Sequence, residues 1–278
     1  MSLSITQPIS KLGAVINGGL ASFGATLRFT GRAYAYGFAG LVRPRLYERR
    51  ELLRQIESMG GRSLPLVIFV ALLIGAGVMA QTVPDFQRRG VPEVAPGVLA
   101  ITITRFIAPV ITALLFAGRV GASLSAEIGA MKLGEELDAL QAMAIKPIAF
   151  VAAPRVMAVG FALAGLTIVF EVVALFGGFV MGVAAYGISA EVFGESVRRF
   201  IVLYDVLFAV VKAFCYAIGI AAVALYRGFH VEGGSAELGR ATMGAVVMCQ
   251  AVIIAIDLVC AMVNNVLQAW GLVPMAPV

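Results

Sequence analysis

The sequence predicts an all-α integral membrane protein, and three observations carry this prediction. Of its 278 residues, 60% are hydrophobic and only 13% are charged, about half of the charged share that a soluble domain carries. The apolar residues come in runs long enough to cross a bilayer as helices, which takes about 20 residues each. The basic residues that give the net charge of +5 stand next to these runs, a pattern typical of membrane topology. We therefore expect lipid, and no nucleic acid, around the chain.

The N-terminal region, residues 1–62, is predicted to lie at the membrane surface. Residues 9–42 are apolar, Gly-rich and sparsely charged, and a run of arginines follows them. Such a segment suits an amphipathic helix in the plane of the interface, with arginines reaching the headgroups; a sixth span is the alternative. The first ten residues lack the basic start and the apolar core of a cleaved signal peptide. We expect the mature chain to begin here, in a bacterial inner membrane.

Five transmembrane helices are predicted within residues 63–278. Their charge-poor cores cover about 63–83, 95–118, 156–188, 201–226 and 241–270. The third comes from a 37-residue apolar stretch, 156–192, in which Glu171 is the only charge before Glu191 near its end. Because this stretch is too long for one upright helix, we expect it to end in irregular backbone around the glycines at 177, 178 and 182. Ser189 is the predicted N-cap of a short external helix that ends at Phe200.

The loop charges predict how these spans are oriented. The N-terminal segment, the loop 119–155 and the loop 227–240 hold nine, four and two Lys or Arg residues, whereas the loops on the opposite side hold four. Cytoplasmic loops are enriched in Lys and Arg. We therefore expect a cytoplasmic N-terminus and a periplasmic C-terminus.

The loop between the second and third spans, residues 119–155, is the most informative stretch. Its apolar residues recur near helical spacing, Ser123 or Ser125 is expected to cap a short helix, and Pro147 is expected to end it. One interpretation is a connector lying on the membrane surface. The other is a coupling helix whose apolar face docks in a groove of a cytoplasmic motor subunit. The charged candidates for this coupling are Glu127, Lys132, Glu135, Glu136 and Asp138.

Charged residues within the spans are expensive at bilayer depth, so each is expected to have a partner or a watery cavity. Lys212 lies 11 residues after Ile201, and Asp257 lies 13 residues before Trp270. At 1.5 Å per residue their depths agree to within about 3 Å, which predicts an ion pair, either a structural clasp or a moving part. Asp205 stands two turns from Lys212, too far for a direct bridge.

Two further intramembrane charges have no partner by depth. Glu171 is expected to face the cavity or a water-filled vestibule. Arg105 lies inside the second span, where its guanidinium either meets a lipid phosphate or snorkels to the headgroups. Both interpretations stay open at this stage.

The loop and its flanks carry a family resemblance. The stretch LLFAGRVGASLSAEIGAMKLGEELDALQAMAIKPIAFVAAPRVMA, residues 114–158, resembles the signature of the MlaE/YrbE permeases, the membrane subunits of MCE-type ABC lipid transporters. The resemblance is strongest over residues 105–158. It is also visible at residues 53–56 and at Gly75 with Gln81, and it covers most of the chain.

The resemblance implies an architecture and a set of partners. It implies an MlaE-like fold with an interfacial helix and five spans, working as a homodimer on two ATPase subunits of the MlaF type. A STAS-domain protein of the MlaB type often lies beneath, and a hexamer of MCE-domain proteins of the MlaD type lies on the periplasmic side. Phospholipid or another hydrophobic molecule passes through a cavity at the dimer interface. The cavity residues that it implies here are Gly75, Gln81, Arg105 and Phe106.

The sequence departs from the family pattern at one point in the second span. Family members read roughly Arg-Glu-Leu-Gly-Pro there, whereas this chain has Arg105, Phe106, Ile107, Ala108 and Pro109. Phe106 replaces the acidic residue, so a role for it with lipid headgroups does not carry over. The identity of the cargo stays open, with a sterol or another non-phospholipid as the alternative.

The chain contains no motif for energy conversion or catalysis. None of its four lysines follows a glycine, so it has no P-loop, and we expect ATP and Mg to be used by a separate subunit. The three cysteines are isolated and His230 is the only histidine, so neither a disulfide framework nor a metal site is expected. Two other classes remain as alternatives: an ion-coupled carrier with a relay of buried charges, and a non-transporting scaffold. Carriers of that kind usually show internal repeats, and none is visible here.

Overall fold

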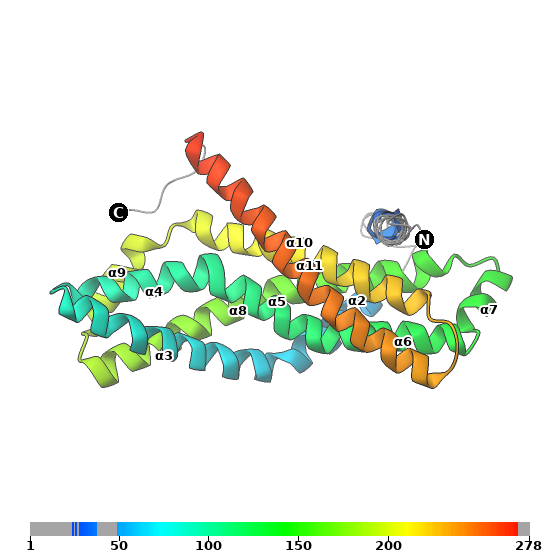
Figure 1. Cartoon of the computed structure of the whole chain (residues 1–278), viewed down its shortest axis with the longest axis horizontal. Coiled ribbons are helices and arrows are strands. Elements are labelled where there is room, and N and C mark those ends of the chain that lie inside the picture. The colour runs from blue at the N-terminus through cyan, green and yellow to red at the C-terminus, as the bar shows by residue number, and fades with distance from the viewer. Residues whose placement is uncertain (1–23, 25, 27, 38–48, 272–278) are drawn as a thin grey trace, which may run out of the picture.

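The computed structural model describes residues 24, 26, 28–37 and 49–271, and every regular element in this part of the chain is helical (Figure 1). The α-helices are α2 (Arg49–Gly60), α3 (Leu64–Arg88), α4 (Ala95–Thr102), α5 (Ala108–Phe116), α6 (Ala122–Leu133), α7 (Glu136–Ala142), α8 (Ala153–Tyr186), α9 (Ala190–Phe200), α10 (Leu203–Phe229) and α11 (Ser235–Ala269). Three π-helical segments lie between them: η3 (Ile103–Ile107), η4 (Ala117–Gly121) and η5 (Ile148–Ala152). Two 3₁₀ turns, η1 (Gly61–Ser63) and η2 (Pro92–Val94), precede the first two spans.

Five helical stretches are long and apolar enough to cross a membrane. They are Arg50–Arg88, Pro92–Leu133, Ile148–Tyr186, Leu203–Phe229 and Ser235–Ala269. This confirms the predicted fold class of five spans. The stretches are longer than the predicted apolar cores because several helices continue past the bilayer boundary. Figure 1 shows α7 at one end of the elongated bundle and α9 at the other, which fits a coupling segment and an external helix on opposite sides of a membrane.

The third span is one unbroken helix, so the prediction of irregular backbone near its end is wrong. α8 runs through Gly177 and ends at Gly187, which has φ 67°. The glycines serve packing instead. A Cβ at Gly177 would overlap the backbone carbonyl of Leu72, and a Cβ at Gly75 would overlap that of Ala174. α3 and α8 therefore cross with their backbones in contact, as small residues allow between membrane helices.

Proline lets a further contact, a hydrogen bond, form between the same helices. Pro84 lies inside α3 and has no N–H to give to the carbonyl of Ala80, four residues earlier. The Tyr186 hydroxyl, at the end of α8, donates a hydrogen bond to that carbonyl over 3.0 Å. Pro84 leaves the Ala80 carbonyl without its usual helical donor. This carbonyl thus forms a hydrogen bond that links α3 to α8.

The short helix after the third span forms with the predicted cap. α9 begins after Ser189, whose Oγ accepts a hydrogen bond from the Val192 amide over 3.3 Å. Ser196 of the same helix accepts a hydrogen bond from the Gly97 amide over 3.0 Å. The second bond fixes α9 against the start of the second span.

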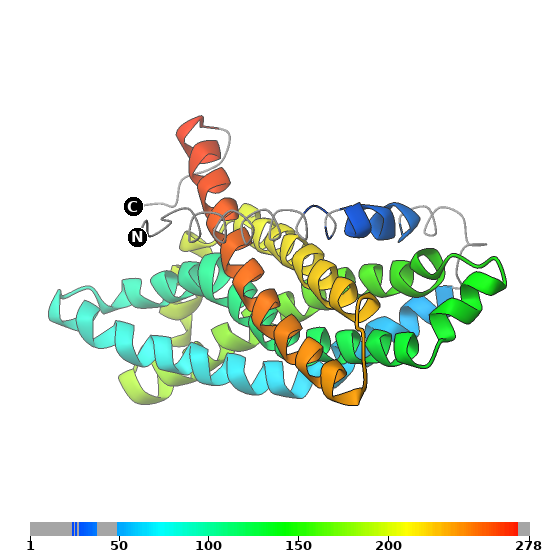
Figure 2. The same ribbon diagram turned by 45° about the vertical axis from the view of Figure 1, so that its right-hand side comes forward.

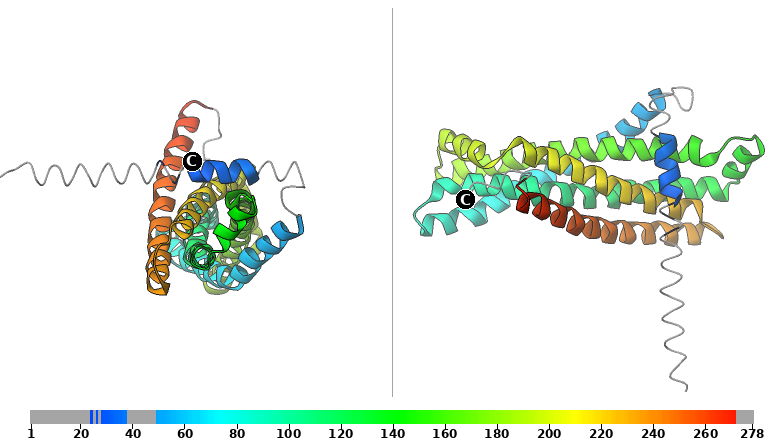
Figure 3. Two further views of the ribbon diagram at one scale, coloured as in Figure 1. Left: turned by 90° about the vertical axis from the view of Figure 1, so that its right-hand side faces the viewer. Right: turned by 90° about the horizontal axis from the view of Figure 1, so that it is seen from above.

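The described part of the N-terminal helix, residues 28–37, crosses the bundle axis near the end that carries α6 and α7 (Figures 2 and 3). Its Phe29 ring contacts the rings of Tyr226 and Phe229, with centroids 6.3 and 5.1 Å away. This direction is the one that an interfacial helix takes beside upright spans. The remainder of the predicted segment, 9–23 and 38–42, lies outside the described residues.

Candidate functional site

The predicted ion pair between the fourth and fifth spans is present. Lys212 Nζ lies 2.6 Å from Asp257 Oδ1. The Tyr216 hydroxyl donates a second hydrogen bond to the same carboxylate oxygen over 2.6 Å. The Lys212 side chain is 3% exposed and that of Asp257 is 30% exposed, so the depth argument located a pair whose ammonium is buried inside the protein.

A second ion pair, which the sequence did not predict, joins the second and fourth spans. Arg105 Nε lies 2.7 Å from Asp205 Oδ1. The other oxygen of Asp205 accepts a hydrogen bond from the Val202 amide over 3.1 Å, which caps the start of α10. The Arg105 guanidinium is therefore held by a protein carboxylate, a partner that neither of the two open interpretations, a lipid phosphate and snorkelling to the headgroups, included. A long arginine side chain can meet a partner several residues away in depth, which matching Cα depths misses.

Pro109 connects the two pairs into one network. It stands four residues after Arg105 and lacks the N–H that an α-helix would offer to the Arg105 carbonyl. Lys212 Nζ donates to that carbonyl over 3.0 Å. Two cations and two carboxylates from three spans thus share one set of contacts, so each buried charge has an opposite charge beside it.

Glu171 lies apart from this network. Its side chain is 4% exposed, and one carboxyl oxygen is buried without a hydrogen-bond partner in the described part of the chain. The expectation that Glu171 faces an open cavity or vestibule is wrong for this conformation, because α8 turns this side chain into the protein interior.

The four cavity residues implied by the resemblance do not come together within one chain. Gly75 is packed on the Ala174 backbone, and Arg105 belongs to the charged network. Gln81 is exposed on α3, and Phe106 is 59% exposed in η3. Gln81 and Phe106 thus remain available to lipid or to a second copy of the chain.

The loop between the second and third spans forms two helices, and its apolar face is already occupied. α6 continues the second span without a cap, and Ser125 is buried inside it, so neither serine starts a helix as predicted. Ile128 and Leu137 are 0% and 2% exposed in the core of the protein. Ile128 and Leu137 are therefore not free to dock into a motor subunit as predicted, whereas Met143 of the same loop is 62% exposed. An amphipathic pattern shows that one face is buried, but not against what.

The charged residues of the same loop fall into two groups. Lys132 pairs with Asp138 at 3.1 Å, which holds α6 and α7 together. Glu135 and Glu136 are exposed at the start of α7, and no ion pair is found for either within the described residues. These two carboxylates are the part of the predicted set that stays available to a partner.

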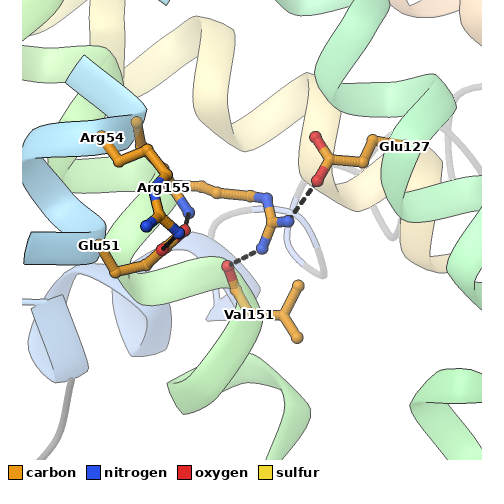
Figure 4. A network of polar contacts seen from close by, with 6 residues as sticks. Glu51, Arg54, Glu127, Val151 and Arg155 are labelled. Carbon is orange, nitrogen blue, oxygen red and sulfur yellow. Dashed lines mark hydrogen bonds and ion pairs between the residues drawn. The ribbon is translucent and has the colours of Figure 1, made fainter. Parts of the chain in front are cut away.

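Glu127 is tied to the third span. The guanidinium of Arg155, near the start of α8, forms an ion pair with Glu127 and donates a hydrogen bond to the Val151 carbonyl over 2.8 Å (Figure 4). The Arg155 side chain is 13% exposed. This contact links α6 directly to α8. The neighbouring pair in Figure 4, Glu51 with Arg54 at 3.3 Å, lies within α2.

The end of α7 is strained. Ala144 has φ 59°, a left-handed conformation that glycine adopts without cost. Its amide donates to the Gln141 carbonyl and the Ile145 amide donates to the Leu140 carbonyl, both over 2.9 Å. This pattern of two bonds is the Schellman motif, with alanine where glycine is usual.

Five spans built around a paired charge network define a class: a multi-pass membrane protein with the features of a transport protein. The family described as Permease MlaE matches residues 52–263, which is most of the chain. The chain therefore belongs to the MlaE permease family, whose members are permease subunits of ABC transporters and work with an ATPase.

Individual relatives agree with this assignment. A probable ABC transporter permease protein of Synechocystis is 33% identical over 80% of this chain and 83% of its own length. The intermembrane phospholipid transport system permease protein MlaE of Haemophilus influenzae is 33% identical over 84% of this chain and 90% of its own length. The chloroplastic protein TRIGALACTOSYLDIACYLGLYCEROL 1 of Arabidopsis thaliana is 32% identical over 72% of this chain and 57% of its own length. With the family established, the alternatives of an ion-coupled carrier and of a non-transporting scaffold do not hold.

Proposed function

We propose that this permease moves phospholipid, or a similar hydrophobic molecule, between the bacterial inner membrane and an MCE-domain protein in the periplasm. The observation that carries the proposal is the match along 84% of the chain to a permease named for intermembrane phospholipid transport. The N-terminus and the α6–α7 segment lie in the cytoplasm and the C-terminus in the periplasm, in agreement with the distribution of basic residues.

The proposed assembly has the permease at its centre. Two copies form a homodimer with the lipid cavity between them, two ATPase subunits bind ATP and Mg beneath, and a STAS-domain protein and an MCE hexamer complete it. The surface of α11 supports the homodimer. Its buried residues are Ala245, Cys249 and Ile253, all in its first two-thirds, and its C-terminal part leaves the bundle (Figures 1 and 2). Apolar side chains such as Leu258 and Met262 are left exposed there, facing lipid or the second copy.

A path for force follows from the contacts of α6. Glu135 and Glu136 meet the ATPase, and α6 carries the displacement because it packs against α10 and α11. The packing is close: a Cβ at Gly228 of α10 would come within 2.8 Å of Ile128. α10 in turn carries Lys212, so movement at the ATPase reaches the charged network along one helix.

The test measures ATP hydrolysis by the whole complex in proteoliposomes under two conditions. In one, lipid transfer to the MCE protein takes place, and in the other it does not. Glu135→Lys and Glu136→Lys are expected to lower the ATPase stimulation by the permease while leaving insertion unchanged. Glu195→Lys, an exposed charge reversal on α9 at the other end of the bundle, is the matched control. Full stimulation in both α7 variants would contradict the docking role.

A second candidate cargo, a sterol or another non-phospholipid, is favoured by one observation. Phe106 is a large apolar side chain, 59% exposed, where the family pattern has an acidic residue. Mass spectrometry of the lipids that stay with the purified complex distinguishes the two cargoes. Retention of neutral lipid in place of phospholipid would overturn the phospholipid proposal and leave the permease assignment intact.

A further inference from the structure

A small polar pocket lies where the first two spans meet at one membrane boundary. Arg62 directly precedes the predicted first span, and Arg119 directly follows the predicted second span. Because the two spans run in opposite directions, both arginines stand at the same bilayer depth. The structure brings them onto one pocket of about 180 Å³, which also has the hydroxyl-bearing side chains of Ser58 and Ser123 in its wall.

The two arginines have no carboxylate partner in the described part of the chain, and both are exposed. One carboxylate, Glu127, also borders the pocket. Its charge is balanced from outside the pocket by Arg155, whose guanidinium points toward it in Figure 4. The pocket therefore keeps the positive charge of two guanidinium groups.

The size and the position of the pocket limit its occupant. Pockets for whole drug-sized ligands measure roughly 300–1,000 Å³, so this one accommodates a headgroup fragment. Guanidinium groups bind phosphate with two parallel hydrogen bonds, and serine hydroxyls add donors. The pocket opens at the level of lipid headgroups, where phosphate groups are concentrated. The apolar side chains of Met59 and Leu124 also line it.

We propose that this pocket binds the phosphate of an anionic phospholipid in the leaflet at this end of the spans. The lipid connects the α2–α3 junction to the start of α6 and so stabilises the segment that transmits force. The inference requires only that the protein lies in a membrane. It does not depend on which molecule is the cargo, so the transport assay and the binding assay fail independently.

The experiment uses the full-length protein with its ATPase partner, in nanodiscs of phosphatidylcholine with a minority of phosphatidylglycerol. Native mass spectrometry after release counts the lipids that remain bound. The wild type is expected to retain phosphatidylglycerol preferentially. The double variant Arg62→Gln/Arg119→Gln is expected to lose this preference by roughly tenfold or more, the factor that one charge-assisted hydrogen bond provides.

The matched control is Arg198→Gln/Arg199→Gln, which removes the same two charges from exposed positions on α9. It is expected to retain phosphatidylglycerol as the wild type does. Equal retention in the wild type and the pocket variant overturns the proposal. If the double variant does not insert, the single variants Arg62→Gln and Arg119→Gln replace it, and unchanged preference in both overturns the proposal equally.

A second arm separates lipid from free phosphate. Inorganic phosphate is titrated into lipid-depleted protein in detergent, and its competition with phosphatidylglycerol is measured. The proposal expects phosphatidylglycerol to bind more tightly, because the half-buried Met59 side chain contacts the apolar part of a lipid and finds no such part on inorganic phosphate. Inorganic phosphate binding as tightly as the lipid would overturn the assignment to lipid.

Discussion

Four of the five charges within the spans are stable in lipid because each of these side chains has a specific partner; Glu171 is the exception. Lys212 contacts Asp257, and Asp205 contacts Arg105, at 2.6 and 2.7 Å. The carbonyl of Arg105 joins the pairs by accepting a hydrogen bond from Lys212. The Lys212–Asp257 pair could be predicted from depth along two helices. The Arg105–Asp205 pair could not, because it depends on the length and direction of an arginine side chain.

Removing one partner of the Lys212–Asp257 pair is expected to destabilise the protein strongly. Asp257→Asn leaves a buried ammonium without its counter-charge, which costs on the order of 3–5 kcal/mol in buried pairs. Thermal unfolding in detergent measures the change. Asp85→Asn is the control, since Asp85 pairs with Arg88 at 3.9 Å on the exposed surface of α3, where a change of at most about 1 kcal/mol is expected.

A double variant of the same pair tests whether the pair takes part in movement. Lys212→Met/Asp257→Leu removes both charges and is expected to recover most of the lost stability, because a buried pair replaced by apolar side chains is often neutral. If lipid transfer stays low in this stable double variant, the pair takes part in movement. Full transfer would identify it as a structural clasp.

At the scale of single helices, the sequence predicted the positions of the helices reliably. It predicted the role of their small residues less well. The glycines of α8 looked like breaks in a span, yet α8 is continuous and uses them to approach α3. Glycine weakens a helix unless a neighbouring backbone needs the space. That neighbour, the Leu72 carbonyl beside Gly177, is distant in sequence and so was invisible before the fold was known.

Two alanine substitutions in α8 separate these effects. Gly177→Ala is expected to lower the free energy of unfolding by roughly 1–3 kcal/mol, because the new Cβ would overlap backbone that has to move. Gly165→Ala, in the same helix with open space around it, is expected to be neutral or to stabilise by up to about 1 kcal/mol. Equal effects of the two changes on the melting temperature would contradict the close crossing of α3 and α8.

The left-handed conformation of Ala144, at the end of α7, predicts the opposite effect: here a change to glycine stabilises the protein. Ala144→Gly is expected to raise the free energy of unfolding by about 1 kcal/mol, since it relieves the strain of a positive φ. Ala142→Gly, two residues earlier inside α7, is expected to lower it by about 0.5–1 kcal/mol. The difference between the two melting temperatures checks the motif.

At the scale of the whole molecule, hydropathy predicted the five spans that the structure shows, and the orientation that the loop charges predict stays a prediction. The coupling segment was only half predicted. Its charged residues were identified, but its apolar face packs on the permease itself, through Ile128 and Leu137. An amphipathic pattern predicts that one face of a helix is buried, but it does not identify the residues that bury it. Under the proposed coupling role, force that reaches this segment would pass through contacts inside the chain, such as that of Glu127 with Arg155.

That contact allows a test of transmission across the molecule. Glu127→Arg is expected to lower the ATPase stimulation by the permease several-fold, because it places two cations beside each other. The swap Glu127→Arg/Arg155→Glu is expected to restore most of it, since the link from α6 to α8 forms again with the charges exchanged. A swap that leaves stimulation as low as the single variant would show that Glu127 acts on the ATPase directly.

Pro109 has a consequence for how the spans assemble in the bilayer. In hydrocarbon, an ammonium group donates to any oxygen within reach, so several alignments of the fourth span against the second would compete. Because the ring nitrogen of Pro109 carries no hydrogen, no local N–H donates to the Arg105 carbonyl oxygen. That oxygen is therefore free to accept a hydrogen bond from Lys212, at one depth in the membrane. The N–H group that proline lacks thereby sets the vertical alignment of the fourth span against the second.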